Sequence, residues 1–231
     1  MLDIRRFSDL GQFNNDWLNA NYHFAFSSYF DPDRLGHGKL RVWNDDTIRA
    51  QTGFPPHGHR DMEIITYVRS GAITHEDSMG NKGRTEAGDV QVMSAGSGVQ
   101  HSEWNAENED TTIFQIWIEP NEMGGAPAWG AREFPKQDRS GQWAVLASGE
   151  GEQDALSIRQ DARILGATLK TGDALSYEIK NGRYGYLVLA TGAVELNGQR
   201  LEARDGAAIT GEQVINLIGL EEAEIVFVDT V

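Results

Sequence analysis

The sequence contains no cysteine, which excludes disulfide bonds, thiolate metal ligands and a thiol nucleophile. It also has no run approaching the roughly 18 apolar residues of a membrane-spanning helix. The N-terminal residues MLDIRRFSDLGQFNN lack the apolar centre of a signal peptide. We therefore expect a cytoplasmic protein without a membrane segment, in which any bound metal is held by nitrogen and oxygen atoms.

Basic residues are scarce as well. The 231 residues include 35 acidic and 20 basic side chains, which gives a formal net charge of −15. This charge repels nucleic acids and anionic membranes unless basic side chains cluster, and here they are scattered along the chain. The composition argues against direct binding to nucleic acid or membrane, whereas a basic protein partner is compatible with it.

Long helical patterns are few. Twenty-six glycines lie between short runs rich in β-branched and aromatic residues, a pattern that predicts an all-β chain with many turns. The clearest runs are 63–68, 112–118, 185–190 and 224–228. Their spacing favours a sandwich or a barrel, and the length allows one large β domain or two ordinary ones.

A segment rich in glycine, proline and charge, residues 119–141, separates two blocks of predicted strands and predicts a linker. We expect domains at 1–125 and 126–231. The runs 68–74 and 88–92 have weaker echoes at 189–195 and 205–209, which indicates duplication of one β-barrel unit. All six histidines (23, 37, 57, 59, 75 and 101) lie in the first half, so the second domain is predicted to be a structural partner without metal.

Two pairs of metal-binding side chains stand out. His57 and His59 form one pair, and His101 and Glu103 form another about 40 residues later. In a β-strand, i and i+2 side chains share a face, about 6.6 to 6.8 Å apart along the strand. Two such pairs on facing strands can converge on one ion, and three imidazoles with a carboxylate suit a divalent transition metal.

Other residues near these pairs have more than one interpretation. Glu63 and Asp61 share the strand parity of the first histidine pair. For Glu63 we favour a role as acceptor for a ligand's second N–H, or a structural role, over direct ligation. Glu103 is either a fixed ligand or also a general base that accepts a proton from a bound hydroxyl, and the residues alone favour neither role.

The aromatic and remaining polar residues are expected to be mainly structural. His23, Phe24 and Phe26 form either a wall of the barrel mouth or, preferably, part of the core. Gly96 and Gly98 suit a tight turn. The remaining expectations are a core position for Trp43, Trp104 and Trp117 and a surface position for His37 and His75.

The run HGHRDME (57–63), followed by Gly71, resembles the first motif of the cupins. The second cupin motif is matched imperfectly, because Ser94 stands where proline is usual and the turn is two residues longer. These departures match the pirins, which carry an AGxGxxHxE stretch, here residues 95–103. Residues 23–32, 41–46 and 75–81 are also similar to pirins, and the resemblance is thinner in the C-terminal half.

The resemblance implies a bicupin of two antiparallel jelly-roll barrels, with metal in the N-terminal barrel only. The implied ligands are His57, His59, His101 and Glu103, the same set that the spacing suggests. The resemblance also favours the general-base role for Glu103. Iron(II) is the first choice of metal, although this donor set also accepts zinc, nickel, cobalt, copper or manganese.

Three functions follow from these expectations. The first is a mononuclear dioxygenase that cleaves a flavonol such as quercetin with O2 and releases carbon monoxide, as the most similar bacterial pirins do. The second is a regulatory protein without a substrate, whose metal oxidation state is sensed by a partner protein. The third is a zinc protein with no redox role. We expect a monomer, because two barrels can cover each other within one chain.

Overall fold

The structure, a computed structural model, describes all 231 residues and contains 22 β-strands, three short 3₁₀ helices and no α-helix. The predicted all-β class is therefore confirmed. All the strand pairs are antiparallel, as expected for a chain of short strands and glycine-rich turns. None of its helices has the length and apolar character that crossing a membrane requires.

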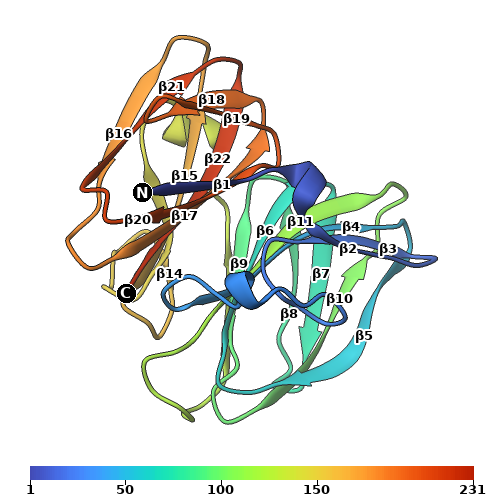
Figure 1. Cartoon of the computed structure of the whole chain (residues 1–231). Helices are drawn as coiled ribbons and strands as arrows, with labels where there is room; N and C mark the ends of the chain where they lie inside the picture. The colour runs from blue at the N-terminus through green and yellow to red at the C-terminus, as the bar shows by residue number, and fades with distance from the viewer. The chain divides into compact units, whose positions relative to one another are not determined.

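The chain forms two compact units, each built from two sheets (Figure 1). The first unit comprises residues 11–134 and 156–160 and holds all six histidines. Its elements are β2 (Gly11–Asn14), β3 (Leu18–Tyr22), η2 (Pro32–Arg34), β4 (Leu40–Ile48), β5 (Thr52–His59), β6 (Glu63–Ser70), β7 (Ala72–Asp77), β8 (Lys82–Glu86), β9 (Val90–Ser94), β10 (Val99–Asn105), β11 (Thr111–Ile118), β12 (Ala128–Arg132) and β14 (Leu156–Ser157).

The sheets of the first unit have the strand orders β12-β9-β6-β11-β4-β3-β2 and β5-β10-β7-β8. Their apolar faces share one core: Ile48 and Ile113 come from the larger sheet, and Ile73 comes from the smaller one. Buried alternate residues along β10 are typical of a strand with one face on the core and one face on solvent. This arrangement turns His101 and Glu103 inward.

The second unit comprises residues 1–10, 135–155 and 161–231. Its elements are β1 (Leu2–Arg5), η1 (Phe7–Asp9), η3 (Lys136–Arg139), β13 (Ala144–Ser148), β15 (Ala162–Leu169), β16 (Ala174–Glu178), β17 (Tyr184–Thr191), β18 (Ala193–Leu196), β19 (Gln199–Glu202), β20 (Gly206–Thr210), β21 (Val214–Gly219) and β22 (Ala223–Thr230). One sheet has the order β1-β20-β17-β22-β15-β13 and the other β16-β21-β18-β19.

The compact units begin and end at other residues than 1–125 and 126–231. Strand β1 pairs with β20, Leu2 opposite Ile209, so the N-terminal residues belong to the second unit. The predicted linker 119–141 contains β12, which pairs with β9 of the first unit. Its short strand was not predicted, because the surrounding glycine and proline residues indicated a linker. The ranges 1–125 and 126–231 stay a prediction of how the chain divides into folding units.

The similar segments 68–74 and 189–195 form corresponding turns in the two units. Gly71 lies between β6 and β7 with φ +74°, and Gly192 lies between β17 and β18 with φ +73°. A Cβ at Gly71 would lie 2.4 Å from Thr111 Oγ1, and one at Gly192 would lie 2.1 Å from the carbonyl oxygen of Glu222. Both turns thus need glycine for conformation and for space. This supports the predicted duplication.

Candidate metal centre and cavity

Three imidazoles converge inside the first unit. His57 and His59 lie at the end of β5, and β10 pairs with this strand so that His101 is directly opposite His57. Ring nitrogens of the three residues all lie within 4.8 Å of one another, and the Nε2 atoms of His57 and His101 are 3.1 Å apart. The sequence prediction that the two pairs would meet is confirmed for these three histidines.

The local sequence of β5 explains this geometry. Pro55 and Pro56 precede His57 and cannot donate to the strand ladder, and the pairing with β10 shifts there. The carbonyl oxygen of Pro55 lies 2.8 Å from His57 Nδ1. This contact directs the other ring nitrogen, Nε2, toward the remaining histidines.

The imidazoles of His59 and His101 are in the neutral form that binds metal. Burial, followed by the charges of His57 and His59, lowers the pKa of His101 to about 2. Burial and the charge of His57 lower the pKa of His59 to about 4. Both rings are consequently neutral near pH 7, and neutral imidazole nitrogen is a common ligand of divalent metals. The donor set therefore fits a divalent metal ion.

Behind the triad, a chain of polar contacts leads away from His101. Its Nδ1 lies 3.4 Å from Nδ1 of His75, whose Nε2 lies 3.1 Å from Asp77 Oδ2. The Trp129 ring stacks on His75 at 4.8 Å with an interplanar angle of 8°. Burial tends to raise the pKa of Asp77, but hydrogen bonds from Asn81, His75 and backbone N–H groups lower it overall.

The predicted surface position of His75 is wrong, because its side chain is only 1% exposed. Strand β7 extends through Asp77 and pairs with β10, where Glu103 lies opposite His75. The sequence suggested a turn at this point, whereas the turn begins after the strand. His37 is half-buried, away from the triad, so its predicted surface position is only partly met.

Glu103 lies next to the triad, on the same face of β10 as His101. Its Oε1 accepts hydrogen bonds from Thr66 Oγ1 at 2.9 Å and Gln91 Nε2 at 2.7 Å, and its Oε2 accepts one from Gln115. Burial raises the pKa of Glu103, against the lowering effects of Thr66 and of the nearby imidazoles. The carboxyl group is thus fixed by three donors beside the histidines.

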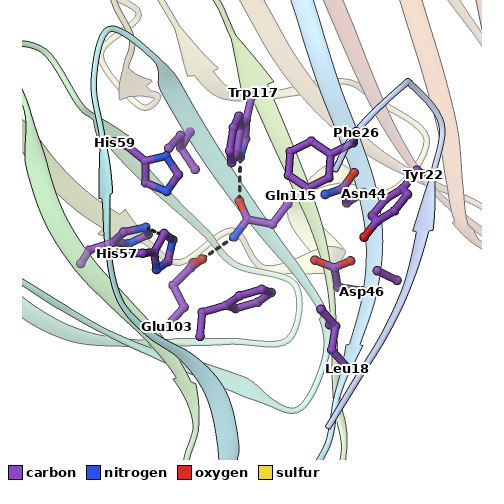
Figure 2. A pocket seen from close by; sticks show the side chains of 14 residues that line it. Leu18, Tyr22, Phe26, Asn44, Asp46, His57, His59, Glu103, Gln115 and Trp117 are labelled. Atoms are coloured by element: carbon purple, nitrogen blue, oxygen red, sulfur yellow. Dashed lines mark hydrogen bonds between the residues drawn. The ribbon is translucent and has the colours of Figure 1, made fainter. Parts of the chain in front are cut away.

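A cavity of about 630 Å³, a volume that includes open solvent at its mouth, lies in front of these residues. It lies between the two sheets of the first unit, and most of its wall is apolar or aromatic, as in small-molecule sites. Figure 2 shows His57, His59 and Glu103 at one end and Asn44, Asp46 and Tyr22 at the other. Gln115 lies between the two ends, where Trp117 Nε1 donates to its Oε1 at 3.4 Å.

Several aromatic side chains lie as expected and others do not. Phe24 and Trp43 are fully buried, as predicted. Phe26 and Trp117 instead line the cavity, 5.4 Å apart edge to face. Trp104 is 41% exposed, and its predicted core position is wrong because it alternates with the inward residues of β10. His23 is buried against the Trp43 ring, in agreement with a core role.

The remaining acids do not join the triad. Strand β5 ends at His59, and Asp61 has φ +51°, so the strand parity that would have aligned Asp61 and Glu63 with the histidines is lost. The Glu63 carboxylate accepts hydrogen bonds from Ser94 Oγ at 2.6 Å and from the Arg159 backbone N–H at 3.1 Å, which is a structural role. Gly96 and Gly98 form the expected tight turn, with positive φ at both.

The sequence did not predict four residues that line the cavity or hold Glu103: Asn44, Asp46, Gln91 and Gln115. For the first two a signal was present in the chain. Along β4 the inward positions read Val42, Asn44, Asp46 and Ile48, so two polar side chains occupy places where a barrel core expects apolar ones. The glutamines carry no comparable local signal.

Comparison with known proteins agrees with the fold and identifies the family. The pirin family model matches residues 4–118, and the model described as quercetinase C-terminal cupin domain matches residues 145–230. A pirin-like protein of Caulobacter vibrioides is 61% identical over 99% of each chain. The chain belongs to the pirin family. The predicted family is confirmed over both halves, including the C-terminal half where the resemblance was thin.

Two relatives of this pirin-family chain bear on its site. Quercetin 2,3-dioxygenase of Escherichia coli is 37% identical, covering 99% of this chain and 98% of that protein, so the predicted oxidoreductase class matches the name of a relative. Bacterial pirin YhhW from E. coli, solved in complex with nickel(II), has a TM-score of 0.94 and 35% identity, covering 100% of this chain and 99% of that one. The bicupin fold is thereby confirmed, and the histidine triad indicates a site for a divalent metal.

Proposed function

We propose that this protein is a metal-dependent dioxygenase that opens flavonols such as quercetin with O2 and releases carbon monoxide. The observation that carries the proposal is the combination of the triad with a buried carboxyl group at one end of an aromatic-lined cavity. The relatives named as quercetin 2,3-dioxygenases give independent support. Iron(II) is proposed from the resemblance to pirins, and a monomeric state and the cytoplasm are proposed from features of the sequence.

His57, His59, His101 and Glu103 would hold the metal. When bound, a divalent ion would act as a Lewis acid that orients the substrate's oxygen atoms and stabilises its anion. Pro55 and His75 contact the ring nitrogens of His57 and His101 and so fix the orientation of both imidazoles. The low pKa values of His59 and His101 keep these rings unprotonated throughout the neutral range.

Glu103 is proposed to accept the proton of the flavonol 3-hydroxyl. Burial raises its pKa above that of an ordinary glutamate, which makes the carboxylate a stronger base near neutral pH. Thr66, Gln91 and Gln115 hold the two carboxylate oxygens in place, so the base needs little reorganisation. Proton transfer to Glu103 would leave the negative charge on the substrate oxygen beside the metal ligands.

The aromatic part of the substrate would lie between Phe26, Phe54 and Trp117, with Leu18 and Ile64 completing an apolar wall. Flat rings suit such a cavity, because aromatic side chains contact them in stacked or edge-to-face arrangements. The same walls exclude water from the oxygenated substrate, which would otherwise be open to side reactions.

Oxygen consumption and carbon monoxide release by anaerobically reconstituted protein, expressed per bound iron(II), test the proposal. On addition of quercetin we expect metal-dependent uptake of O2 with matching release of carbon monoxide. Glu103→Gln should retain folding and lose turnover by about 10²-fold or more if the carboxylate is the base. Tightly bound metal without any uptake would refute the dioxygenase and favour the regulatory alternative.

A further inference from the structure

The end of the cavity opposite the histidines is polar, and nothing in the proposed reaction uses it. Asn44 and Asp46 lie two residues apart on β4, and both side chains line the cavity. In the sheet, Asn44 is opposite Tyr22 of β3 and Gln115 of β11. Figure 2 shows Asn44, Asp46 and Tyr22 together at this end, remote from His57 and His59.

These two side chains carry hydrogen-bonding atoms that the fold leaves unused. Asp46 is 2% exposed and Asn44 is 5% exposed. The Oδ1 atom of each is buried and has no hydrogen-bond partner. Buried polar atoms are normally paired, and exceptions call for an explanation. Glu103, in the same cavity, has three donors, so a lack of donors is not a general feature of this interior.

The neighbouring residue Asp45 shows what a structural carboxylate in this strand does. Its side chain points to the other face of β4 and forms an ion pair with Arg69. Asp46 has no such ion pair, although it is buried to the same degree. The strand would be more stable with an apolar side chain at position 46, as at Val42 and Ile48, so Asp46 is suited to a ligand rather than to the fold.

The polar end is suited to an uncharged group. Burial, followed by the charges of Asp45 and Glu103, raises the pKa of Asp46, against the effect of Arg69. Burial and the charge of Asp46 raise the pKa of Tyr22 to about 12. Protonated Asp46 and neutral Tyr22 and Asn44 would offer both donors and acceptors to a hydroxyl group, whereas a second carboxylate or a phosphate would find no cation among the residues that line the cavity.

We infer that Asn44 and Asp46 form a subsite that binds a phenolic hydroxyl of the substrate, at the end remote from the atoms held at the histidine triad. This inference rests on the proposed function, because the flavonol's 3-hydroxyl and 4-keto group are assigned to the metal end. The substrate class is narrowed to flavonols that carry a free hydroxyl on an outer ring. The subsite determines specificity and takes no part in the proton transfer to Glu103.

Equilibrium binding to the metal-loaded protein without oxygen separates this subsite from catalysis. The probes are quercetin, galangin, which lacks hydroxyls on the pendant ring, and 3-hydroxyflavone, which lacks all hydroxyls except the 3-hydroxyl. Dissociation constants follow from the absorbance or fluorescence change of each flavonol. We expect quercetin to bind about tenfold more tightly than 3-hydroxyflavone, the effect of one well-made buried hydrogen bond. The affinity of galangin shows which ring carries the hydroxyl that is bound. If galangin binds as tightly as quercetin, the contact is to the fused ring. If it binds only as tightly as 3-hydroxyflavone, the contact is to the pendant ring.

Asp46→Leu should reduce the quercetin preference to about twofold or less and leave the binding of 3-hydroxyflavone nearly unchanged. Its unfolding temperature should be equal to or above that of the parent, because an unpartnered buried polar group is removed. Asp46→Ala gives the same test if leucine does not fit, and Asp46→Asn, which keeps hydrogen-bonding atoms, should restore most of the preference. Thr47→Val is the matched control, since Thr47 lies on the same strand and does not line the cavity.

The outcomes of the two proposals are distinct. A quercetin preference that persists in Asp46→Leu or Asp46→Ala, or a parent protein with no preference, would overturn the subsite whatever the activity. Loss of the preference together with normal folding supports it. Absence of oxygen uptake and carbon monoxide release by the parent would refute the dioxygenase, and the binding ratios would still decide whether Asp46 recognises the hydroxyl.

Discussion

The two units of this pirin-family protein have the same sheet order, but the interior of the first contains polar side chains where that of the second contains apolar ones. In the smaller sheet of each unit, β10 and β21 occupy corresponding places, between β5 and β7 in one and between β16 and β18 in the other. β10 turns His101 and Glu103 inward, whereas β21 turns Ile215 and Leu217 inward. The fold therefore does not require polar groups inside the barrel, and those of the first unit indicate a function.

The buried acids that line the cavity of the first unit differ from the buried acids of the second unit. In the second unit, Glu224 pairs with Arg139 and Lys136, and Asp229 pairs with Arg183. In the first unit, Asp45 likewise pairs with Arg69, but Asp46 has no ion pair, and Glu103 is held by neutral donors only. Buried charges that serve structure are usually paired, so the unpaired ones locate the binding cavity.

The largest effect on stability is expected when a carboxyl group, like that of Glu103 in the first unit, is placed in the interior of the second unit. Leu217→Glu would bury a carboxyl group among apolar side chains without donors or a cation, and it should lower the free energy of unfolding by about 3–5 kcal/mol. Ile218→Glu, on the same strand but 42% exposed, is the matched control and should change stability little. Denaturant unfolding of the two variants measures the difference. Equal stabilities would mean that the second interior tolerates polar groups and that the comparison fails.

Removal of one imidazole should disable the metal centre and leave the fold intact. His57→Ala should weaken metal binding on the order of 100-fold or more, because one of three converging nitrogens is lost. Since His57 is only half-buried, the unfolding temperature should change little. Metal content after dialysis and a thermal melt are the measurements, with His37→Ala as control. Stoichiometric metal in His57→Ala would contradict the assignment of the triad.

The sequence predicted the triad because its signal is local. The i, i+2 spacing places His57 and His59 on one face of any regular strand, and the same spacing in the second pair, together with the resemblance, indicated that His101 would join them. Strand parity would also have placed Trp104 outward, but its hydrophobicity suggested the core. His75 was missed because nothing local marks the end of β7 at Asp77.

Other features depend on contacts between distant residues and are not present in local sequence. Pairing of Leu2 with Ile209 brings the N-terminus into the second unit. That Asp46 lacks a partner is likewise a property of the folded barrel, since its neighbour Asp45, with the same side chain, finds Arg69. Residue type and spacing could indicate that β4 is polar. They could not indicate which of the carboxyl groups of Asp45 and Asp46 faces the cavity.

Behind the triad, the contact of His75 with His101 should contribute a smaller share of metal affinity. His75→Phe keeps an aromatic ring against Trp129 but removes the nitrogen that faces His101 Nδ1. We expect metal affinity to fall by about 10–100-fold, as for other residues that orient a ligating imidazole. Glu76→Gln, on the same strand and exposed, should leave it unchanged. Competition with a chelator gives both affinities, and equal values would show that His75 only fills space.

The smallest expected effect is a dependence of stability on pH that comes from Asp46 in the first unit. The pKa of Asp46 is raised in the folded state, mainly by burial, above the ordinary value of 3.8. Folding therefore favours protonated Asp46, and this contribution is complete below pH 3.8 and is lost as the pH rises through the folded-state pKa. Asp46→Asn removes the group that must ionise, so the stability of this variant relative to the parent should rise between pH 4 and pH 7.

Asp229→Asn in the second unit is the counterpart, because it takes a carboxylate from Arg183 and Tyr177. This change should destabilise the protein at pH 7 by about 1–3 kcal/mol, since it weakens a charged hydrogen bond to the partly buried guanidinium of Arg183. Melting of metal-free protein at several pH values measures both variants. If Asp46→Asn were also destabilising at pH 7, Asp46 would be a structural residue like Asp229. If the two variants change stability at pH 7 with opposite signs, then a buried aspartate serves the fold at position 229 and is available to a ligand at position 46.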